Sequence, residues 1–123
     1  MMTAHKNQPF VHRLRFALTG LAAAWRSEAN FRLQAGAFAA VLIALALLKV
    51  EPVWWALVLL TSGLVMTAEL LNTALEHLAD HLHPESHPRI ALVKDCAAAA
   101  VLLAACTAVA VAAALTVHLI IRH

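Results

Sequence analysis

Long apolar stretches alternate with short polar segments along most of this chain. The first two stretches, residues 33–48 and 53–68, would each span only about 24 Å as helices. They must extend at their ends to cross a hydrocarbon layer about 30 Å thick. The pattern predicts an all-α membrane protein whose three transmembrane helices cover residues 33–49, 53–80 and 94–121.

A shorter helix with a different pattern precedes these spans. Its apolar side chains recur at helical spacing: Val11, Leu14, Leu18, Leu21 and Trp25. Because Arg13 and Arg15 lie elsewhere around the helix, we expect an amphipathic surface helix over residues 10–30. A signal peptide is the alternative, since the two arginines precede an apolar stretch that ends in alanines.

Composition agrees with a lipid environment. Apolar residues make up 63% of the 123 residues, charged residues only 13%, and the mean hydropathy is +0.78. This length predicts a single domain, residues 1–123. Cys96 and Cys106 would lie about 15 Å apart along one helix, which excludes a disulfide between them.

The distribution of basic residues predicts how the chain crosses the membrane. Seven of the nine lysines and arginines precede the first span or lie between the second and third. Cytoplasmic loops of membrane proteins carry such an excess of positive charge. We therefore expect a multi-pass protein of the cytoplasmic membrane, with its N-terminus and the second loop in the cytoplasm. The net charge of +2 gives no indication of nucleic-acid binding.

Polar residues mark one face near the end of the second span. On a helix with about 100° per residue they fall within a stripe about 80° wide: Glu69, Asn72, Glu76 and Asp80. A charged group at membrane depth costs about 2.5 kcal/mol or more, so it is seldom present without a partner or a task. Asp80 is expected to be solvated near the loop, whereas Glu69 has apolar neighbours and is expected to have a function.

The predicted topology brings further ionisable groups to the same membrane face. Glu28 precedes the first span, and Lys94 and Asp95 open the third. Carboxylates supply hard oxygen ligands for Mg²⁺, and a lysine can bind phosphate oxygens. These residue types suit phosphoryl transfer, although a generic polar network uses the same types. Glu69 and Glu76 lie about 10 Å apart along a helix, so they should have different roles.

The sequence around these residues resembles the prokaryotic diacylglycerol kinases and the related undecaprenol kinases. Residues 68–76 read AELLNTALE and match the family pattern A-E-x-x-N-T-A-x-E, and Lys94-Asp95 follows. Residues 25–32, WRSEANFR, resemble the acidic segment of the family before the first span. The resemblance covers nearly the whole chain after the first ten residues.

The resemblance implies a bacterial inner-membrane homotrimer that phosphorylates a lipid alcohol, most commonly diacylglycerol, with ATP and Mg²⁺ and with active sites between protomers. It implies that Glu69 is the catalytic base and that Glu28 and Glu76 are metal ligands. The implied nucleotide-binding residues are Glu28, Glu76, Lys94, Asp95 and Asn72. The implied substrate-binding residues are Glu69, Asn72 and Arg32.

Position 34 departs from part of this family, and two other functions remain open. Some diacylglycerol kinases carry an acid at the position of Gln34, and a neutral amide there puts a metal role in doubt. His77 and His81 have the spacing of a zinc site, but the H-E-x-x-H order is absent. A non-enzymatic bundle or transporter subunit would need polar residues through the whole bilayer, and the first span has almost none.

Overall fold

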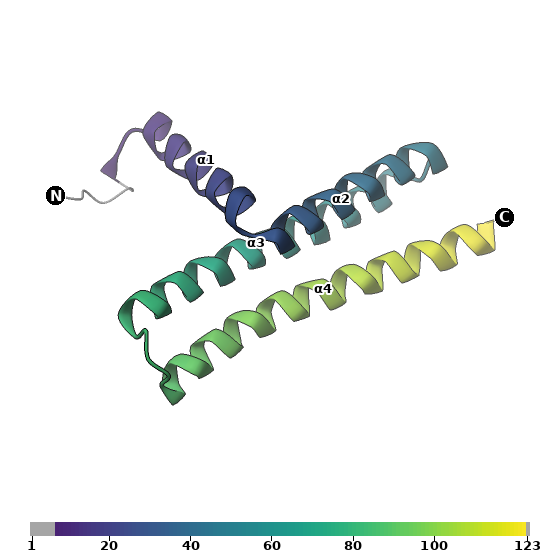
Figure 1. Cartoon of the computed structure of the whole chain (residues 1–123). Helices are drawn as coiled ribbons and strands as arrows, with labels where there is room; N and C mark the ends of the chain where they lie inside the picture. The colour runs from purple at the N-terminus through teal and green to yellow at the C-terminus, as the bar shows by residue number, and fades with distance from the viewer. Residues whose placement is uncertain (1–6, 123) are drawn as a thin grey trace.

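The computed structural model describes residues 7–122, and its regular structure in that range is helical (Figure 1). Four helices follow one another along the chain: α1 (Phe10–Ser27), α2 (Ala29–Leu48), α3 (Pro52–Leu82) and α4 (Pro88–Arg122). Three of them, α2, α3 and α4, are long and apolar enough to cross a membrane. The prediction of an all-α protein with three such helices is confirmed.

The break between α1 and α2 is a single residue. Glu28 has an extended backbone, with φ −115° and ψ 103°, and caps both helices. Figure 1 shows that α1 leaves the bundle at this point and that α3 continues well past the junction toward its loop. The junction therefore lies beside the middle of the molecule, where α3 carries its polar stripe.

The turn between α2 and α3 is tight because of two backbone features. Lys49 ends α2 in the left-handed conformation with φ 52°. Pro52 occupies the first turn of α3, where its missing N–H needs no partner. This turn packs with the end of α4 around a small apolar cluster: Leu45, Val50, Val58 and Leu115, covered by Trp54 and Trp55.

A polar contact closes the same end of the molecule. Oε1 of Glu51 accepts a hydrogen bond of 3.1 Å from Nη1 of Arg122, and its Oε2 lies 2.9 Å from Nε2 of His118. We call these three residues the turn clamp. Partial desolvation raises the pKa of Glu51, but the hydrogen bond and charge of His118, with the charge of Arg122, outweigh it and hold that pKa below its usual value of 4.5.

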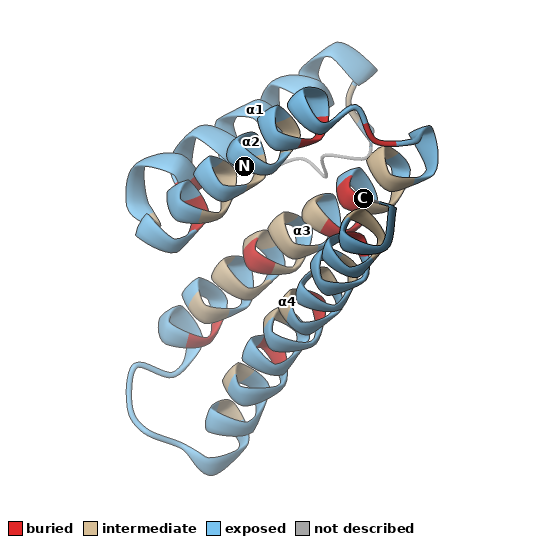
Figure 2. Cartoon of the chain, turned by 90° about the vertical axis from the view of Figure 1, so that its right-hand side faces the viewer, coloured by how far each residue is buried: buried red, intermediate tan, exposed pale blue. Residues whose placement is uncertain are grey.

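Burial within one chain is low, as Figure 2 shows. In the most apolar window of each candidate span, between 11% and 17% of the residues are buried. Most apolar side chains of α2, α3 and α4 therefore face outward, where a lipid environment or another chain can cover them.

The helix bounds differ from the predicted ones mainly at two places. The first span was expected to begin at residue 33, but α2 starts at Ala29 because Glu28 already provides the helix break. The third was expected to begin at Lys94, but α4 starts at Pro88, since proline is accepted in a first helical turn. The loop is thus confined to residues 83–87.

Candidate functional site

Glu69 is buried although its side chain is ionisable. Its exposed fraction is 6%, and among the described residues it is the one buried side chain that can carry a charge. It lies on α3, and its Oε2 accepts a hydrogen bond of 3.2 Å from Nε2 of Gln34 on α2. The chain therefore keeps a carboxylate inside the helix pair with a neutral amide as its partner.

The next polar residues along the same face of α3 contact each other. Asn72 Nδ2 lies 3.5 Å from Oε1 of Glu76, at the limit for a hydrogen bond, and both side chains are half-buried. The spacing of four residues brings them onto one side of the helix. Asn72 Oδ1 is buried and has no hydrogen-bond partner within residues 7–122. Asn72 thus retains an unused acceptor at this level of α3.

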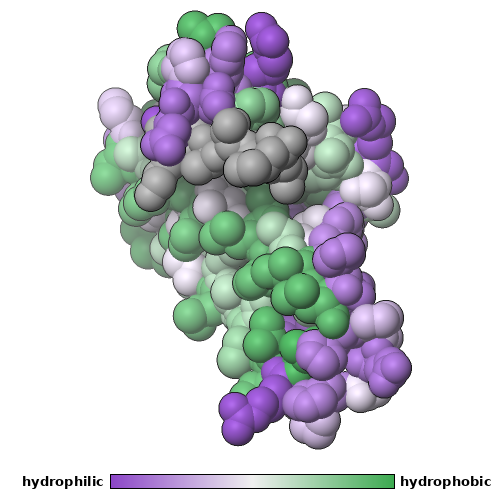
Figure 3. Space-filling view, turned by 90° about the vertical axis from the view of Figure 1, so that its left-hand side faces the viewer, coloured by the Kyte–Doolittle hydropathy of each residue, from purple (hydrophilic) through white to green (hydrophobic). Residues whose placement is uncertain are grey.

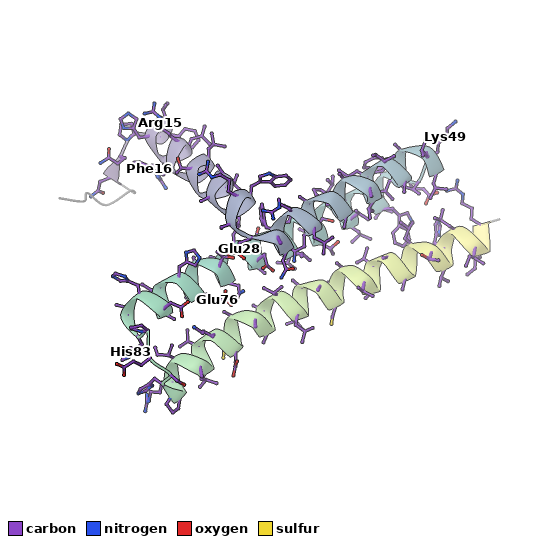
Figure 4. All side chains as sticks on the ribbon, viewed as in Figure 1. Arg15, Phe16, Glu28, Lys49, Glu76 and His83 are labelled. Atoms are coloured by element: carbon purple, nitrogen blue, oxygen red, sulfur yellow. The ribbon has the colours of Figure 1, made fainter. Side chains whose placement is uncertain are left out.

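Glu28 is brought to α3 by the break between α1 and α2. Its Oε1 lies 4.0 Å from Nε2 of His77, the residue directly after Glu76. Figure 4 shows Glu28 and Glu76 in the middle region of the molecule, between His83 at one end and Lys49 at the other. The two carboxylates predicted to hold metal therefore lie at the same level of the bundle.

Lys94, on the first turns of α4, forms an ion pair with Asp80 near the end of α3. Both side chains are partly exposed, at 38% for Lys94 and 61% for Asp80. The adjacent Asp95 is exposed. Asp80 was expected to be a solvated helix-end residue; it is exposed, but it also engages the one lysine predicted to bind phosphate.

Arg32, predicted to bind substrate, closes the end of α1. Its Nη1 donates to the backbone carbonyl oxygens of Trp25 at 2.6 Å and Arg26 at 3.2 Å. The last carbonyls of a helix lack intrahelical partners, so a basic side chain stabilises them. The role of Arg32 toward substrate stays a prediction.

The donor set suits Mg²⁺ better than zinc. No three His, Cys, Asp or Glu side chains within residues 7–122 form a group that could hold a metal by themselves. The four histidines near the α3–α4 loop, His77, His81, His83 and His87, are exposed. Mg²⁺ usually takes only one or two carboxylates together with substrate phosphates and water, which is what Glu28 and Glu76 can offer with a nucleotide.

An apolar cavity opens beside the polar stripe, between α3 and α4. Its volume is about 780 Å³, and its lining includes Leu71, Asn72, Leu75, Leu92 and Ala97. Figure 3 shows apolar atoms bordered by hydrophilic atoms at the end of the molecule that carries the α3–α4 loop. An apolar cavity with an amide at its wall is compatible with a lipid that carries one polar group.

Three neighbours of the predicted residues were missed as partners in the sequence. Gln34 was seen only as a missing acid, Asp80 as a solvated end, and His77 as half of a zinc spacing; they contact Glu69, Lys94 and Glu28 respectively. Each contact joins different elements, so helical spacing alone could not reveal it. A signal was available for Asp80, which shares the stripe of Glu69 and Glu76.

Comparison with known proteins connects this arrangement to named enzymes. A diacylglycerol kinase of Synechocystis is 46% identical over 98 residues, which are 79% of this chain and 56% of that protein. An undecaprenol kinase of Bacillus subtilis is 39% identical over 75% of this chain and 72% of its own length. A diacylglycerol kinase of Escherichia coli is 35% identical over 76% of this chain and 77% of its own.

The chain thus spans little more than half of the Synechocystis relative and about three quarters of the other two. The pattern of the prokaryotic diacylglycerol kinase family matches residues 15–116, which include the buried Glu69 and every other predicted site residue. The resemblance found in the sequence is confirmed, and so is the prediction of a lipid kinase family. The chain belongs to the prokaryotic diacylglycerol kinases.

Proposed function

We propose that this chain transfers the γ-phosphoryl group of ATP to the hydroxyl of a membrane lipid, with diacylglycerol as the first candidate, which gives phosphatidic acid. The observation that carries the proposal is the carboxyl side chain of Glu69, which is buried on a helix long and apolar enough to cross a membrane, in a chain from a lipid kinase family. A charged group at membrane depth costs about 2.5 kcal/mol or more, so an ionisable side chain there is seldom present without a function.

Glu69 is the proposed general base. It accepts the proton of the lipid hydroxyl while the hydroxyl oxygen forms a bond to the γ-phosphorus and the bond from that phosphorus to ADP breaks. The products are the lipid phosphate, ADP and one proton. Burial of Glu69 away from bulk water favours a lipid hydroxyl over water as the acceptor.

Glu28 and Glu76 are the proposed ligands of Mg²⁺, and Asn72 and Asp95 the proposed neighbours of the nucleotide. Bound Mg²⁺ would neutralise charge on the phosphates of ATP. Lys94 would bind phosphate oxygens; its ammonium has three donors, so it can keep Asp80 and still bind a phosphate.

The proposed setting is the bacterial cytoplasmic membrane, with the N-terminus and the site on the cytoplasmic side. The excess of basic residues in the N-terminal part and in the first turns of α4, Arg89 and Lys94, supports this orientation. Helix α1 carries exposed apolar side chains, among them Phe10 at 73%, Val11 at 64% and Trp25 at 50%. These support the proposal that α1 lies on the membrane surface.

Undecaprenol is the second candidate substrate, favoured by the 39% identity to the Bacillus subtilis undecaprenol kinase. A transporter subunit finds less support. The buried polar or charged side chains among the described residues are Thr61 and Glu69, and Thr61 Oγ1 donates to carbonyls of its own helix. They do not make a polar path across the helices.

The decisive assay offers Mg-ATP to the purified full chain in mixed micelles, with diacylglycerol and undecaprenol in parallel samples. The expected result is the higher kcat/KM with diacylglycerol, with Glu69→Gln protein as the inactive control. A higher kcat/KM for undecaprenol would establish the second candidate. Phosphorylation of neither lipid, by protein that still binds the micelle, would contradict the proposed activity.

A further inference from the structure

Gln34 stands where some members of the family carry an acid, and it contacts the proposed base. The contact joins two helices: Nε2 of Gln34 on α2 donates to Oε2 of Glu69 on α3 at 3.2 Å. Gln34 is half-buried and Glu69 is 6% exposed, so water competes little for this hydrogen bond. A hydrogen bond to a charged, poorly hydrated acceptor is stronger than one between neutral groups.

The surroundings select one orientation of the amide. Gln34 Oε1 is buried and has no hydrogen-bond partner within residues 7–122. Exchanging the nitrogen and the oxygen would point Oε1 at the carboxylate of Glu69 and remove the donor from it. The amide therefore stays with its N–H toward Glu69.

We propose that Gln34 is a positioning residue for Glu69. Its amide N–H holds Oε2 of Glu69 in place, which leaves Oε1 of Glu69 as the oxygen that receives the proton of the lipid hydroxyl. The proposal rests on the proposed lipid kinase activity. A carboxylate has two oxygens that can exchange places by rotation, and a donor fixed on one of them prevents this exchange. Gln34 thus acts on the base, whereas an acid there would be suited to a metal.

The type of side chain at position 34 decides whether it can donate a hydrogen bond to Glu69. An amide donates at every pH, whereas a carboxyl donates only in its protonated form and repels Glu69 once it is ionised. Gln34→Glu keeps the size and polarity of the side chain but makes its hydrogen-bond donation depend on pH. Gln34→Leu removes donation at every pH. Leucine fills much of the same space in the bilayer without any donor.

The test compares kcat and KM for ATP of the wild-type chain and both variants, in mixed micelles with diacylglycerol and across a range of pH. Gln34→Leu should lower kcat about tenfold, the effect of one hydrogen bond to a charged group, and leave KM for ATP unchanged. Gln34→Glu should approach wild-type kcat at acidic pH and fall below it as the pH rises. The deficit of Gln34→Leu should persist at every pH.

Thr61→Val is the matched control. It removes a hydroxyl that is buried on α3 and bonds its own helix, 2.9 Å from the carbonyl oxygen of Leu57. The change tests the loss of a buried polar group two turns away from Glu69, so its kcat should equal that of the wild type. Wild-type kcat in Gln34→Leu would overturn the proposal. A raised KM for ATP with unchanged kcat would overturn it too, because it would assign position 34 to the nucleotide.

A second measurement does not depend on activity. In protein labelled with ¹⁵N at glutamine side chains, the amide proton of Gln34 that faces Glu69 should resonate downfield and move upfield in Glu69→Leu, with the resonances of the other glutamine, Gln8, unchanged. The absence of this response would overturn the proposal. Wild-type protein that shows it but phosphorylates no lipid would instead contradict the proposed function, and with it the catalytic purpose of the contact.

Discussion

Glu69 and Glu76 are carboxylates on the same face of α3 with different surroundings. Glu69 is buried against Gln34, whereas Glu76 is half-buried beside Asn72, at the level of Glu28. A buried carboxylate without bulk water is suited to take one proton, and a more accessible one is suited to bind a hydrated cation. Removal of the two charges should therefore affect different steps.

Glu69→Gln should lower kcat by about 10²- to 10⁴-fold, the usual contribution of a general base, and leave the affinity for Mg-ATP largely intact. Glu76→Gln should instead weaken Mg²⁺-dependent ATP binding by at least about tenfold. Loss of a residue that only hydrogen-bonds to a metal ligand already lowers metal affinity by about this factor. Calorimetric titration with Mg-ATP, alongside turnover, measures both. Equal losses of nucleotide affinity in the two variants would contradict this division.

Asp80 gives a smaller prediction at the same scale. Its ion pair with Lys94 is partly exposed, and such pairs contribute about 0.2–1 kcal/mol. Asp80→Asn should raise KM for ATP about 1.4- to 5-fold through looser positioning of Lys94, with kcat nearly unchanged. Asp80→Glu, which keeps the charge, serves as the control. A large loss of kcat in Asp80→Asn would show that Asp80 does more than position Lys94.

At the scale of helices, hydrophobic periodicity predicted the elements well and their partners poorly. The apolar runs are long enough to require three spans, and Pro52 starts α3 as its position suggests. The third span was predicted from residue 94, but α4 begins six residues earlier at Pro88, because proline is accepted in a first helical turn. The hydrogen bond from Gln34 to Glu69 depends on the register of α2 against α3. Packing between the helices sets this register, and the residue spacing within one helix gives no information about it.

The turn clamp ties the α2–α3 turn to the end of α4, and its stability should depend on pH. Because the pKa of Glu51 is lowered in the folded chain by His118 and Arg122, its contribution is present above the usual value of 4.5 and is lost as the pH falls through the lowered pKa. Glu51→Gln should lower the Tm at neutral pH, and the difference should shrink in acid. Thermal unfolding in detergent at both pH values measures it.

Glu85→Gln is the matched control for the turn clamp. Glu85 is an exposed carboxylate in the loop at the other end of the bundle, and it forms no ion pair among residues 7–122. The Tm of the Glu85→Gln variant should equal that of the wild type at neutral pH. A Tm deficit of Glu51→Gln that grows in acid would contradict the turn clamp as described.

A single chain buries too little of its surface to enclose an active site by itself. Each candidate span buries at most 17% of its most apolar window, and no group of three metal-binding side chains forms within residues 7–122. Asn72 Oδ1 and Gln34 Oε1 also lack partners there. Further copies of the chain would cover the apolar faces and enclose the space beside the polar stripe.

We propose that the active form is an oligomer, and the resemblance to the prokaryotic diacylglycerol kinases implies that it is a homotrimer. Native mass spectrometry of the detergent-solubilised protein should give three times the chain mass of 13.2 kDa, and denaturing solvent should return the single mass. Dilution in detergent that separates the chains should remove kinase activity, and reconcentration should restore it, because the site needs more than one copy. A monomer with undiminished kcat would contradict a shared site, since Glu28, Glu76 and Lys94 would then suffice within one chain.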